Sequence, residues 1–477
     1  MSERHLSAQQ LGRLLDTDRS ARPFYRALAQ GVRGLVRDGS VPVRMRMPAE
    51  RHLAQELGVS RTTVTAAYDL LREQGYLDSR QGSGSWTALP DPSVCADNPW
   101  LSVDDDGLLQ MHCAAPPATT MLTEAVAGAM EDLPRYGMGT GYDPMGLPAL
   151  RERIAAHYTA RGLATRPEQI LVTTGSQHAL QLVMSLLLTP GDPVVVESPT
   201  YPHAIDAARH RGARIVPVGI TAEGWQPDLI AGAMRQSAPR LAYLMPDFQN
   251  PTGALMDNAT RAAVVGMARR AGTTLLVDET WTELGIDAPN EAAPMAAFDT
   301  DSRVITIGSA SKLWWGGLRI GWIRTTAALA RGLAVHRSAV DIASPVLDQL
   351  VVARLFDRIE ETRAERRRSL TASRSALVAA LREHLPEWSF TVPRGGGTLW
   401  VRLAGEGATP LAEAAAYHGV RLAPGPWFGV SGTLEGYLRL PFTQSPQVIT
   451  EAVARLAEAR ATGPVGSRPA DPLIRMV

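Results

Sequence analysis

From about residue 108 to about residue 460, short strand-like apolar runs alternate with longer helix-like segments. This alternation is typical of an α/β protein, in which helices cover the faces of a sheet. In such folds the functional residues lie just past the carboxyl ends of the strands. We therefore expect the candidate site residues of this chain to follow its apolar runs directly.

The charged residues are unevenly distributed along the 477 positions. The 48 Lys and Arg residues balance 48 Asp and Glu residues, which excludes a protein that coats nucleic acid along its whole length. Residues 20–88, however, contain ten arginines against six acidic residues. The 45% hydrophobic content excludes a mainly disordered chain, and the length suggests about three globular units. The N-terminal segment is thus a candidate for a local basic surface.

Cysteine usage and hydropathy bear on the compartment. The two cysteines, Cys95 and Cys113, are too few for a disulfide framework and are expected to be free thiols. The N-terminal residues lack the apolar core of a signal peptide, and no apolar run approaches the roughly 18 residues of a membrane span. We expect a cytoplasmic protein that does not cross a membrane.

The basic N-terminal segment has the pattern of a winged helix. Helical periodicity covers 23–39 and 49–59, and Ser60 is placed to cap a third helix at 61–75. The short link before Ser60 is typical of a helix-turn-helix, and a glycine hairpin follows at 81–84. The alternative is a small helical bundle with a solvated basic face. The residues expected to contact DNA phosphates or base edges are Arg44, Arg46, Arg51, Ser60, Arg61, Thr62, Thr63, Thr65, Arg80 and Gly82.

Residues 47–86, MPAERHLAQELGVSRTTVTAAYDLLREQGYLDSRQGSGSW, resemble the GntR family of bacterial regulators. The resemblance implies a homodimer that binds near-palindromic, double-stranded operator DNA. We assign the DNA-binding domain to 20–88 and the α/β domain to 108–460. The stretch 89–107, with three prolines and an acidic triplet, is expected to be a linker, and 461–477 a flexible tail.

Lys312 is the one lysine of the chain, since the other 47 basic residues are arginines. Codon bias explains why lysine is rare, and a leftover surface residue is one interpretation of Lys312. Arginine keeps its proton and cannot form a Schiff base, so the other interpretation is chemistry that needs a primary amine. Lys312 follows an apolar run, beside Ser309 and Ser311 and seven residues before Arg319. That position favours the chemical role.

Four further motifs follow apolar runs. The residues 175–177 open a helix and form a candidate anion site, Tyr201 can stack on a planar ring, Asn250 can donate a hydrogen bond, and Asp278 can balance a cation. Each has an ordinary structural explanation when taken alone: a turn, a cap or a core aromatic residue.

Together these motifs match the needs of pyridoxal phosphate (PLP). The cofactor's aldehyde needs an amine, its phosphate needs N–H groups, hydroxyls and a cation, its ring nitrogen needs an anion, and its ring oxygen and ring face need a donor and an aromatic side chain. Lys312 is the candidate amine, Asp278 the candidate anion for the ring nitrogen, Asn250 the candidate donor to the ring oxygen, and Tyr201 the candidate aromatic side chain. The candidates for binding the phosphate are Gly175, Ser176, Gln177, Ser309, Ser311 and Arg319.

The stretch from about 110 to about 455 resembles the fold-type I aminotransferases of class I/II, notably at 142–162, 394–403 and 436–442. The resemblance implies a large mixed-sheet α/β domain with a smaller α+β C-terminal part, PLP bound at Lys312, and Arg439 as the residue that holds an α-carboxylate. A winged helix joined to such a domain resembles the MocR subfamily of GntR regulators, and the motifs look closest to its YczR-like branch.

The chain departs from the aminotransferase pattern after Asp278. Aminotransferases usually carry a tyrosine two or three residues later, where this chain has Thr280 and Trp281. Threonine can donate only a weaker hydrogen bond to the ring oxygen, which puts efficient transamination in doubt. Trp314 and Trp315, directly after Lys312, either narrow the pocket or fill the core, and we expect them to fill the core.

Three hypotheses remain open. The chain is a regulator that senses PLP, or an amine or amino-acid effector; or it is a working aminotransferase with a DNA-binding appendage; or it is a repressor whose cofactor domain is only a dimerisation scaffold.

Overall fold

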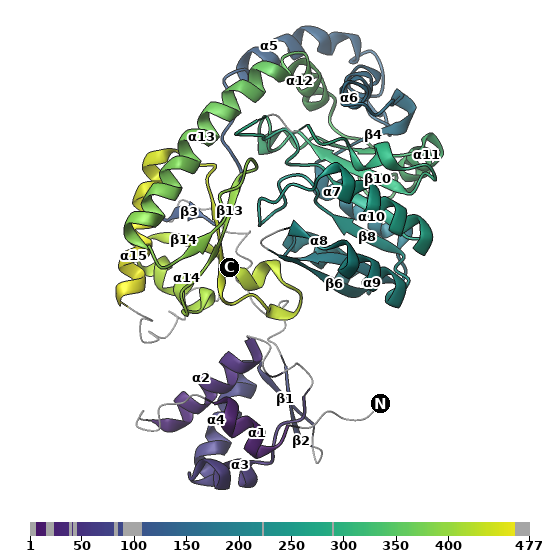
Figure 1. Cartoon of the computed structure of the whole chain (residues 1–477). Helices are drawn as coiled ribbons and strands as arrows, with labels where there is room; N and C mark the ends of the chain where they lie inside the picture. The colour runs from purple at the N-terminus through teal and green to yellow at the C-terminus, as the bar shows by residue number, and fades with distance from the viewer. Residues whose placement is uncertain are drawn as a thin grey trace. The chain divides into compact units, whose positions relative to one another are not determined.

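The computed structural model describes residues 6–15, 23–37, 41, 45–80, 84–88, 107–221, 224–288 and 291–462. The chain divides into two compact units (Figure 1). The first comprises residues up to Gly107 together with Ser431–Glu435, and the second comprises Leu108–Val430 and the residues from Gly436 on. Each unit has its own hydrophobic core. The predicted linker and tail lie outside the described residues, except for Gly107, Ala461 and Thr462.

The first unit contains the predicted three helices and hairpin. Gly58 adopts the left-handed conformation that ends α3, and the Ser60 side chain caps α4 by accepting the Thr63 N–H. Helix α1 was not predicted, and its Leu11 is fully buried in the same core as Leu53. The elements are α1 (Ala8–Leu14), α2 (Phe24–Arg37), α3 (Glu50–Leu57), α4 (Arg61–Glu73), β1 (Leu77–Arg80) and β2 (Gly84–Thr87), with β1 and β2 antiparallel.

The larger sheet of the second unit has eight strands in the order β4-β11-β10-β9-β8-β5-β6-β7. Strands β6, β5, β8, β9 and β10 are parallel, whereas β11 is antiparallel to both β10 and β4. Strand β4 therefore points the same way as β10. The strands are β4 (Ile170–Thr173), β5 (Pro193–Ser198), β6 (Arg214–Thr221), β7 (Gly224–Trp225), β8 (Leu241–Leu244), β9 (Thr274–Asp278), β10 (Val304–Ser309) and β11 (Gly321–Arg324).

Helices cover this sheet, as the alternating pattern predicts. Figure 1 shows α7, α8, α9, α10 and α11 beside its strands. The strands are almost entirely buried because the helices cover them, which explains their continuous apolar runs. The helices are α5 (Leu122–Asp132), α6 (Pro148–Ala160), α7 (Ser176–Leu187), α8 (Pro202–His210), α9 (Pro227–Ser237), α10 (Asn258–Ala271), α11 (Ala327–Arg337) and α12 (Val346–Phe356).

A second, five-stranded sheet forms the smaller α+β part, in the order β12-β13-β15-β14-β3. Its edge strand β3 comes from the start of the unit, and Leu109 of β3 pairs in parallel with Val420 of β14. The mixed-sheet architecture predicted for the chain is thus confirmed. The remaining elements are β3 (Leu109–Met111), α13 (Ile359–His384), β12 (Ser389–Phe390), β13 (Thr398–Arg402), α14 (Ala408–Tyr417), β14 (Val420–Pro424), β15 (Tyr437–Pro441) and α15 (Pro446–Thr462).

The described residues also form six short 3-10 helices. They are η1 (Leu133–Arg135), η2 (Pro167–Gln169), η3 (Met295–Phe298), η4 (Gly316–Leu318), η5 (Gly425–Phe428) and η6 (Val430–Gly432). Among the described residues, no helix combines the length and apolar character needed to cross a bilayer.

Candidate functional site

Five strands of the large sheet end at the same edge, and the predicted cofactor residues follow them. Strands β4, β5, β8, β9 and β10 share one direction, so the residues after their carboxyl ends gather there. The topology therefore brings together all the candidates that the sequence separates. They are Gly175, Ser176 and Gln177 after β4, Tyr201 after β5, Asn250 after β8, Asp278 and Thr280 at the end of β9, and Ser309, Ser311 and Lys312 at the end of β10.

Lys312 lies in the turn after β10, with its amine enclosed by protein. Its Nζ donates to the Ala114 carbonyl oxygen at 2.7 Å and lies 4.9 Å from the centroid of the Trp281 ring. Burial disfavours the ammonium form, which lowers the pKa of Lys312 to about 8. Lys312 is therefore not a leftover surface residue, and a large fraction of its amine is neutral near pH 8.

Asp278 ends β9 as a buried carboxylate with two donors. The Tyr243 hydroxyl donates to its Oδ2 at 2.8 Å, and the Thr280 backbone N–H donates to its Oδ1 at 2.9 Å. Burial raises the pKa of Asp278, while these hydrogen bonds and the charge of Lys312 act to lower it. The environment thus contains the partners that a buried carboxylate needs.

A narrow cradle lies between the loop after β4 and the loop before β11. Gly175, with a φ of 85°, precedes α7, and a Cβ placed on it would come within 2.7 Å of Arg319 Nη2. A Cβ on Gly321 would lie 2.6 Å from the Ser176 nitrogen. Helix N-termini bind anions through free N–H groups, and the Arg319 guanidinium lies beside this one. The two glycines therefore let the Arg319 guanidinium and the N-terminus of α7 come close together, and a phosphate bound there stays a prediction.

Two serines lie next to the cradle on the β10 side. Ser309 is buried, and its Oγ accepts the backbone N–H of Ser311 at 3.1 Å. Gln177, in the first turn of α7, has a buried amide oxygen without a hydrogen-bond partner among the described residues. The donors and hydroxyls predicted for the phosphate are thus in place, although their contact with a phosphate stays a prediction.

Arg439 and Asn250 meet from opposite parts of the unit. Arg439, on β15 of the small sheet, donates from Nη1 to Asn250 Oδ1 at 3.2 Å and from Nη2 to the His112 carbonyl oxygen. Its guanidinium lies 4.8 Å from the centre of the Phe428 ring. Burial lowers the pKa of Arg439 to about 10, at which it is still charged at neutral pH. A buried guanidinium of this kind suits a carboxylate ligand.

Tyr201 precedes α8 and lies within electrostatic range of the same groups. Burial raises the pKa of its phenol, as does the nearby charge of Asp278, whereas Arg439 and Arg319 act in the opposite direction. Its ring packs edge-to-face on His203 at 5.2 Å. The structure therefore places Tyr201 among the predicted site residues, and its stacking on a cofactor ring stays a prediction.

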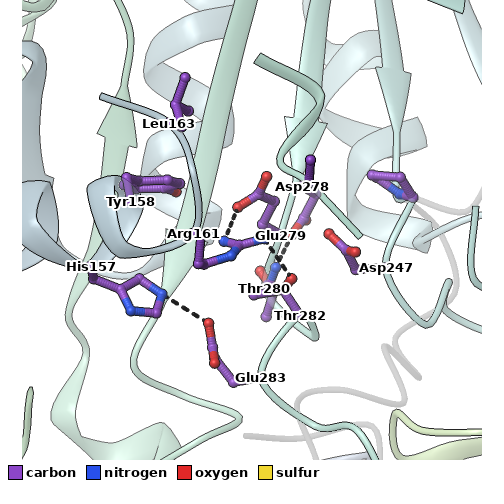
Figure 2. Close-up of polar contacts among 12 residues, drawn as sticks. His157, Tyr158, Arg161, Leu163, Asp247, Asp278, Glu279, Thr280, Thr282 and Glu283 are labelled. Atoms are coloured by element: carbon purple, nitrogen blue, oxygen red, sulfur yellow. Dashed lines mark hydrogen bonds and ion pairs between the residues drawn. The ribbon is translucent and has the colours of Figure 1, made fainter. Parts of the chain in front are cut away.

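A buried ionic network, which the sequence did not reveal, supports the turn after Asp278 (Figure 2). Arg161 at the end of α6 donates to Glu279 Oε2 at 2.8 Å and to Thr282 Oγ1 at 3.1 Å. His157, one turn earlier, contacts Glu283 Oε1 at 2.9 Å. These residues tie both ends of the turn that carries Thr280 and Trp281 to α6, so they fix that turn in space.

Trp281 fits a space that glycines leave open. A Cβ on Gly397 would come within 2.5 Å of the Trp281 ring, and one on Gly395 within 2.4 Å of the Phe248 ring. The Gly395–Gly397 run therefore allows the small part to approach the turn closely. Trp314 is buried as predicted, but Trp315 is 42% exposed, so the prediction that both fill the core was wrong for Trp315. The Trp315 side chain reaches the surface of the unit instead of its core.

The predicted DNA contacts fall on the start of α4 and around it. Arg61 is 73% exposed, and Arg51, Ser60 and Thr62 are also exposed. Ser60 Oγ lies 2.7 Å from the hydroxyls of both Thr62 and Thr63. The exposed hydroxyls and guanidinium suit phosphate and base-edge contacts, and these contacts stay predictions.

Other predicted DNA contacts are occupied or lie outside the description. The Thr65 hydroxyl donates to Glu50 Oε2 at 2.8 Å, and Arg46 lies 5.9 Å from the Trp86 ring centroid. Arg44 and Gly82 lie outside the described residues, as does the Arg80 side chain, although the Arg80 backbone pairs with Gly84. Cys113 is a free thiol, as expected, and Cys95 is not among the described residues.

Two family descriptions match this chain. "Aminotransferase class I and II" matches residues 116–456, and "Bacterial regulatory proteins, gntR family" matches residues 24–86. The first match covers more than half of the chain. The chain therefore belongs to the class I and II aminotransferase family, which uses PLP as cofactor, and carries a gntR-type DNA-binding domain at its N-terminus.

Known relatives include both regulators and enzymes. The "Probable rhizopine catabolism regulatory protein MocR" of Rhizobium meliloti is 31% identical over 409 residues, which cover 79% of this chain and 80% of that protein. The 2-aminoadipate transaminase of Thermus thermophilus is 33% identical over 311 residues, which cover 63% of this chain and 78% of that enzyme. The two-domain layout and the first relative place the chain in the MocR subfamily of GntR regulators. The YczR-like branch stays a prediction.

Solved aminotransferases share the fold of the second unit. The α-aminoadipate aminotransferase LysN of Thermus thermophilus, complexed with N-(5'-phosphopyridoxyl)-L-leucine, has a TM-score of 0.69 and 30% identity over 75% of this chain and 93% of that chain. The kynurenine aminotransferase of Pyrococcus horikoshii has a TM-score of 0.70 and 27% identity over 75% of this chain and 92% of that chain.

Proposed function

We propose that this protein is a transcription regulator that binds operator DNA through its winged helix and PLP at Lys312. A cofactor, or an amine or amino-acid ligand of the cofactor, would then change its operator affinity. One observation carries the proposal: the lone lysine, the buried Asp278 and the cradle of Gly175 and Arg319 converge at one edge of the large sheet.

Each group in the site suits one part of the cofactor. The Lys312 amine binds the aldehyde carbon, and the Asp278 carboxylate holds a proton on the ring nitrogen. The Ser176 N–H, Ser309, Ser311 and Arg319 bind the phosphate. When bound, PLP supplies an electrophilic carbon and an electron-withdrawing ring.

Arg439 gives the site a place for the ligand's carboxylate. Its guanidinium donates to neutral protein acceptors, the Asn250 side chain and the His112 carbonyl. A carboxylate that replaced either contact would form a charge-assisted pair in a buried setting. This favours an amino acid as the effector over a simple amine.

We also propose a homodimer. Met138, Tyr142, Val340 and Ile342 are large apolar or aromatic residues that stay exposed on the second unit. Exposed apolar residues that gather in one patch mark a protein interface, and we propose that these four residues do so. A dimer would present two winged helices to two half-sites of a near-palindromic operator.

Operator binding with and without cofactor tests the proposal. The purified full-length protein would first select double-stranded DNA from a random pool, and binding would then be measured with PLP, without PLP, and with PLP plus single amino acids. We expect PLP to change the affinity at least about threefold for the unmodified protein and not for Lys312→Ala. Equal affinities for both proteins in all conditions would overturn the sensing role.

A second candidate is a working aminotransferase. The intact Lys312, Asp278 and Arg439 set favours it, as does the 33% identity to a transaminase. The test is single-turnover conversion of bound PLP to its amine form by a panel of amino acids, followed optically. Fast conversion would establish an enzyme with a DNA-binding domain, whereas the absence of conversion together with PLP-dependent DNA binding would establish a regulator alone.

A further inference from the structure

Tyr243 lies inside β8, one strand away from Asp278. Its ring is fully buried, and its hydroxyl donates to Asp278 Oδ2 at 2.8 Å. The opposite oxygen of the carboxylate accepts the Thr280 N–H at 2.9 Å. Each carboxylate oxygen therefore accepts one of these two hydrogen bonds, and each oxygen can accept two.

We propose that Tyr243 is a positioning residue that keeps Asp278 ionised and oriented for the ring nitrogen of the bound cofactor. The inference rests on the proposed PLP site and adds to it a residue that does not itself touch the cofactor. A hydrogen bond from a phenol stabilises the negative carboxylate, and a carboxylate held by fixed donors cannot rotate away from its ligand.

A core tyrosine with no function would satisfy its hydroxyl on any nearby acceptor. Here the partner is Asp278, the carboxylate at the centre of the site, which lies on the neighbouring strand β9 and not on β8 itself. The hydroxyl costs free energy to bury unless it is paired, so the strand tolerates tyrosine because Asp278 is there. Phenylalanine would fill the same space without this cost.

Other titratable groups of the described residues lie near the pair formed by Tyr243 and Asp278. Glu197, from β5, is buried and accepts from Trp225 Nε1 at 2.6 Å, and its burial raises its pKa to about 7. Tyr201 and Lys312 also lie within electrostatic range of the pair. Among these groups, Tyr243 donates a hydrogen bond directly to Asp278, and it does so from the neighbouring strand β8.

Tyr243→Phe in the full-length protein tests the inference. Loss of the donor makes the Asp278 carboxylate more basic, so it draws the proton from the ring nitrogen. The ring then carries less positive charge, and the nitrogen that joins Lys312 to the cofactor becomes more basic. We expect the pH midpoint of the bound cofactor's visible band to rise, in the same direction as in Asp278→Asn but by less, and PLP affinity to fall on the order of tenfold.

Two further variants separate positioning from folding. Tyr158→Phe removes another fully buried phenol, one that accepts from Trp322 Nε1 at 3.1 Å, and should leave the midpoint unchanged. Site-specific 3-fluorotyrosine at 243 keeps the ring in place and strengthens the donor, so it should lower the midpoint.

The outcomes distinguish the two proposals. A midpoint and an affinity that are unchanged in Tyr243→Phe and with 3-fluorotyrosine would overturn the positioning role, even though PLP binds. An unmodified protein with no visible band that depends on Lys312 would overturn the cofactor site itself.

Discussion

The Lys312 amine lies 4.9 Å from the centroid of the Trp281 ring. The ring occupies the place where aminotransferases usually carry a tyrosine, three residues after Asp278, and it is held there by the ionic network on Glu279 and Thr282. An ammonium group over an indole is stabilised by the ring's negative face. This position beside Lys312 therefore carries an indole and not a phenol that could transfer a proton.

Replacing Trp281 by tyrosine should increase transaminase activity. A phenol near the cofactor's ring oxygen and Lys312 would supply the missing donor, and groups that move protons contribute tenfold to many thousandfold to rates. We expect the single-turnover rate with amino acids to rise at least about tenfold. Trp281→Phe, which shortens the ring without adding a hydroxyl, is the matched control and should show no rise; an equal rise in both variants would contradict this explanation.

The reaction of Lys312 with PLP should depend on pH in a defined window. The neutral amine is the nucleophile, and burial lowers the pKa of Lys312 to about 8 from the ordinary value of 10.5. The rate of cofactor capture should therefore rise with pH up to about 8 and then level off. Stopped-flow absorbance of the cofactor-free protein measures this, with a lysine-containing peptide as reference. A rate that keeps rising up to pH 10 would show that the pKa of the Lys312 amine is not lowered.

The Gly175→Ala variant should lose cofactor affinity because of crowding in the cradle. The new Cβ would lie 2.7 Å from Arg319 Nη2, in addition to the strain of a positive φ. Gly162→Ala has nearly the same φ and nothing within 4 Å, so it carries the backbone strain alone. Titration with PLP should show at least about tenfold weaker binding for Gly175→Ala and normal binding for Gly162→Ala. Similar losses in both would attribute the effect to strain.

Breaking the Arg161–Glu279 pair should destabilise the second unit. The Glu279 side chain is 1% exposed, so Arg161→Met leaves a buried carboxylate without its cation. We expect a loss of about 3–5 kcal/mol in the free energy of unfolding, measured with urea, and partial recovery when Glu279→Met is added. Arg153→Met breaks the more exposed pair with Asp357 and should cost less than about 1 kcal/mol. Equal losses would contradict the role of burial.

The Arg61→Ala variant should weaken operator binding. Arg61 opens α4 with an exposed guanidinium, where a phosphate or base edge would lie. We expect a loss of about 1–3 kcal/mol in binding free energy, and a smaller slope of affinity against salt if the contact is to a phosphate. The Arg402→Ala variant, which removes an exposed arginine from the second unit, controls for net charge. Fluorescence anisotropy over a salt series measures both, and equal losses would argue against a local contact.

Residues whose role depends on a local motif were predictable. Ser60 precedes a helical period and caps it, Gly175 opens α7, and Asp278 and Lys312 end strands that are recognisable by their apolar runs. Turn chemistry and strand ends depend on a few consecutive residues, so the sequence displays them directly. Helix α1 was not predicted because its seven residues bury a single side chain, Leu11, and so show no helical apolar pattern.

Residues whose role depends on distant partners were not predictable. Tyr243 looks like an ordinary core aromatic within an apolar run until β8 lies beside β9. Ala114 and Lys312 meet across 198 positions of sequence, and Arg439 and Asn250 meet across 189 positions. Arg161 and Glu279 are 118 positions apart.

The amino-acid sequence alone indicated the two-part organisation, the strand ends that the candidate site residues follow, and Lys312 as the candidate amine of the site. It could do so because a lone lysine, strand-ending small residues and a capped helix act through chemistry and local backbone geometry. The tertiary structure was needed to show which groups surround Lys312 and Asp278, and hence in which direction the pKa values of these two groups shift. Those shifts depend on burial and on charges brought near by the packing of strands and helices, and no local pattern contains either.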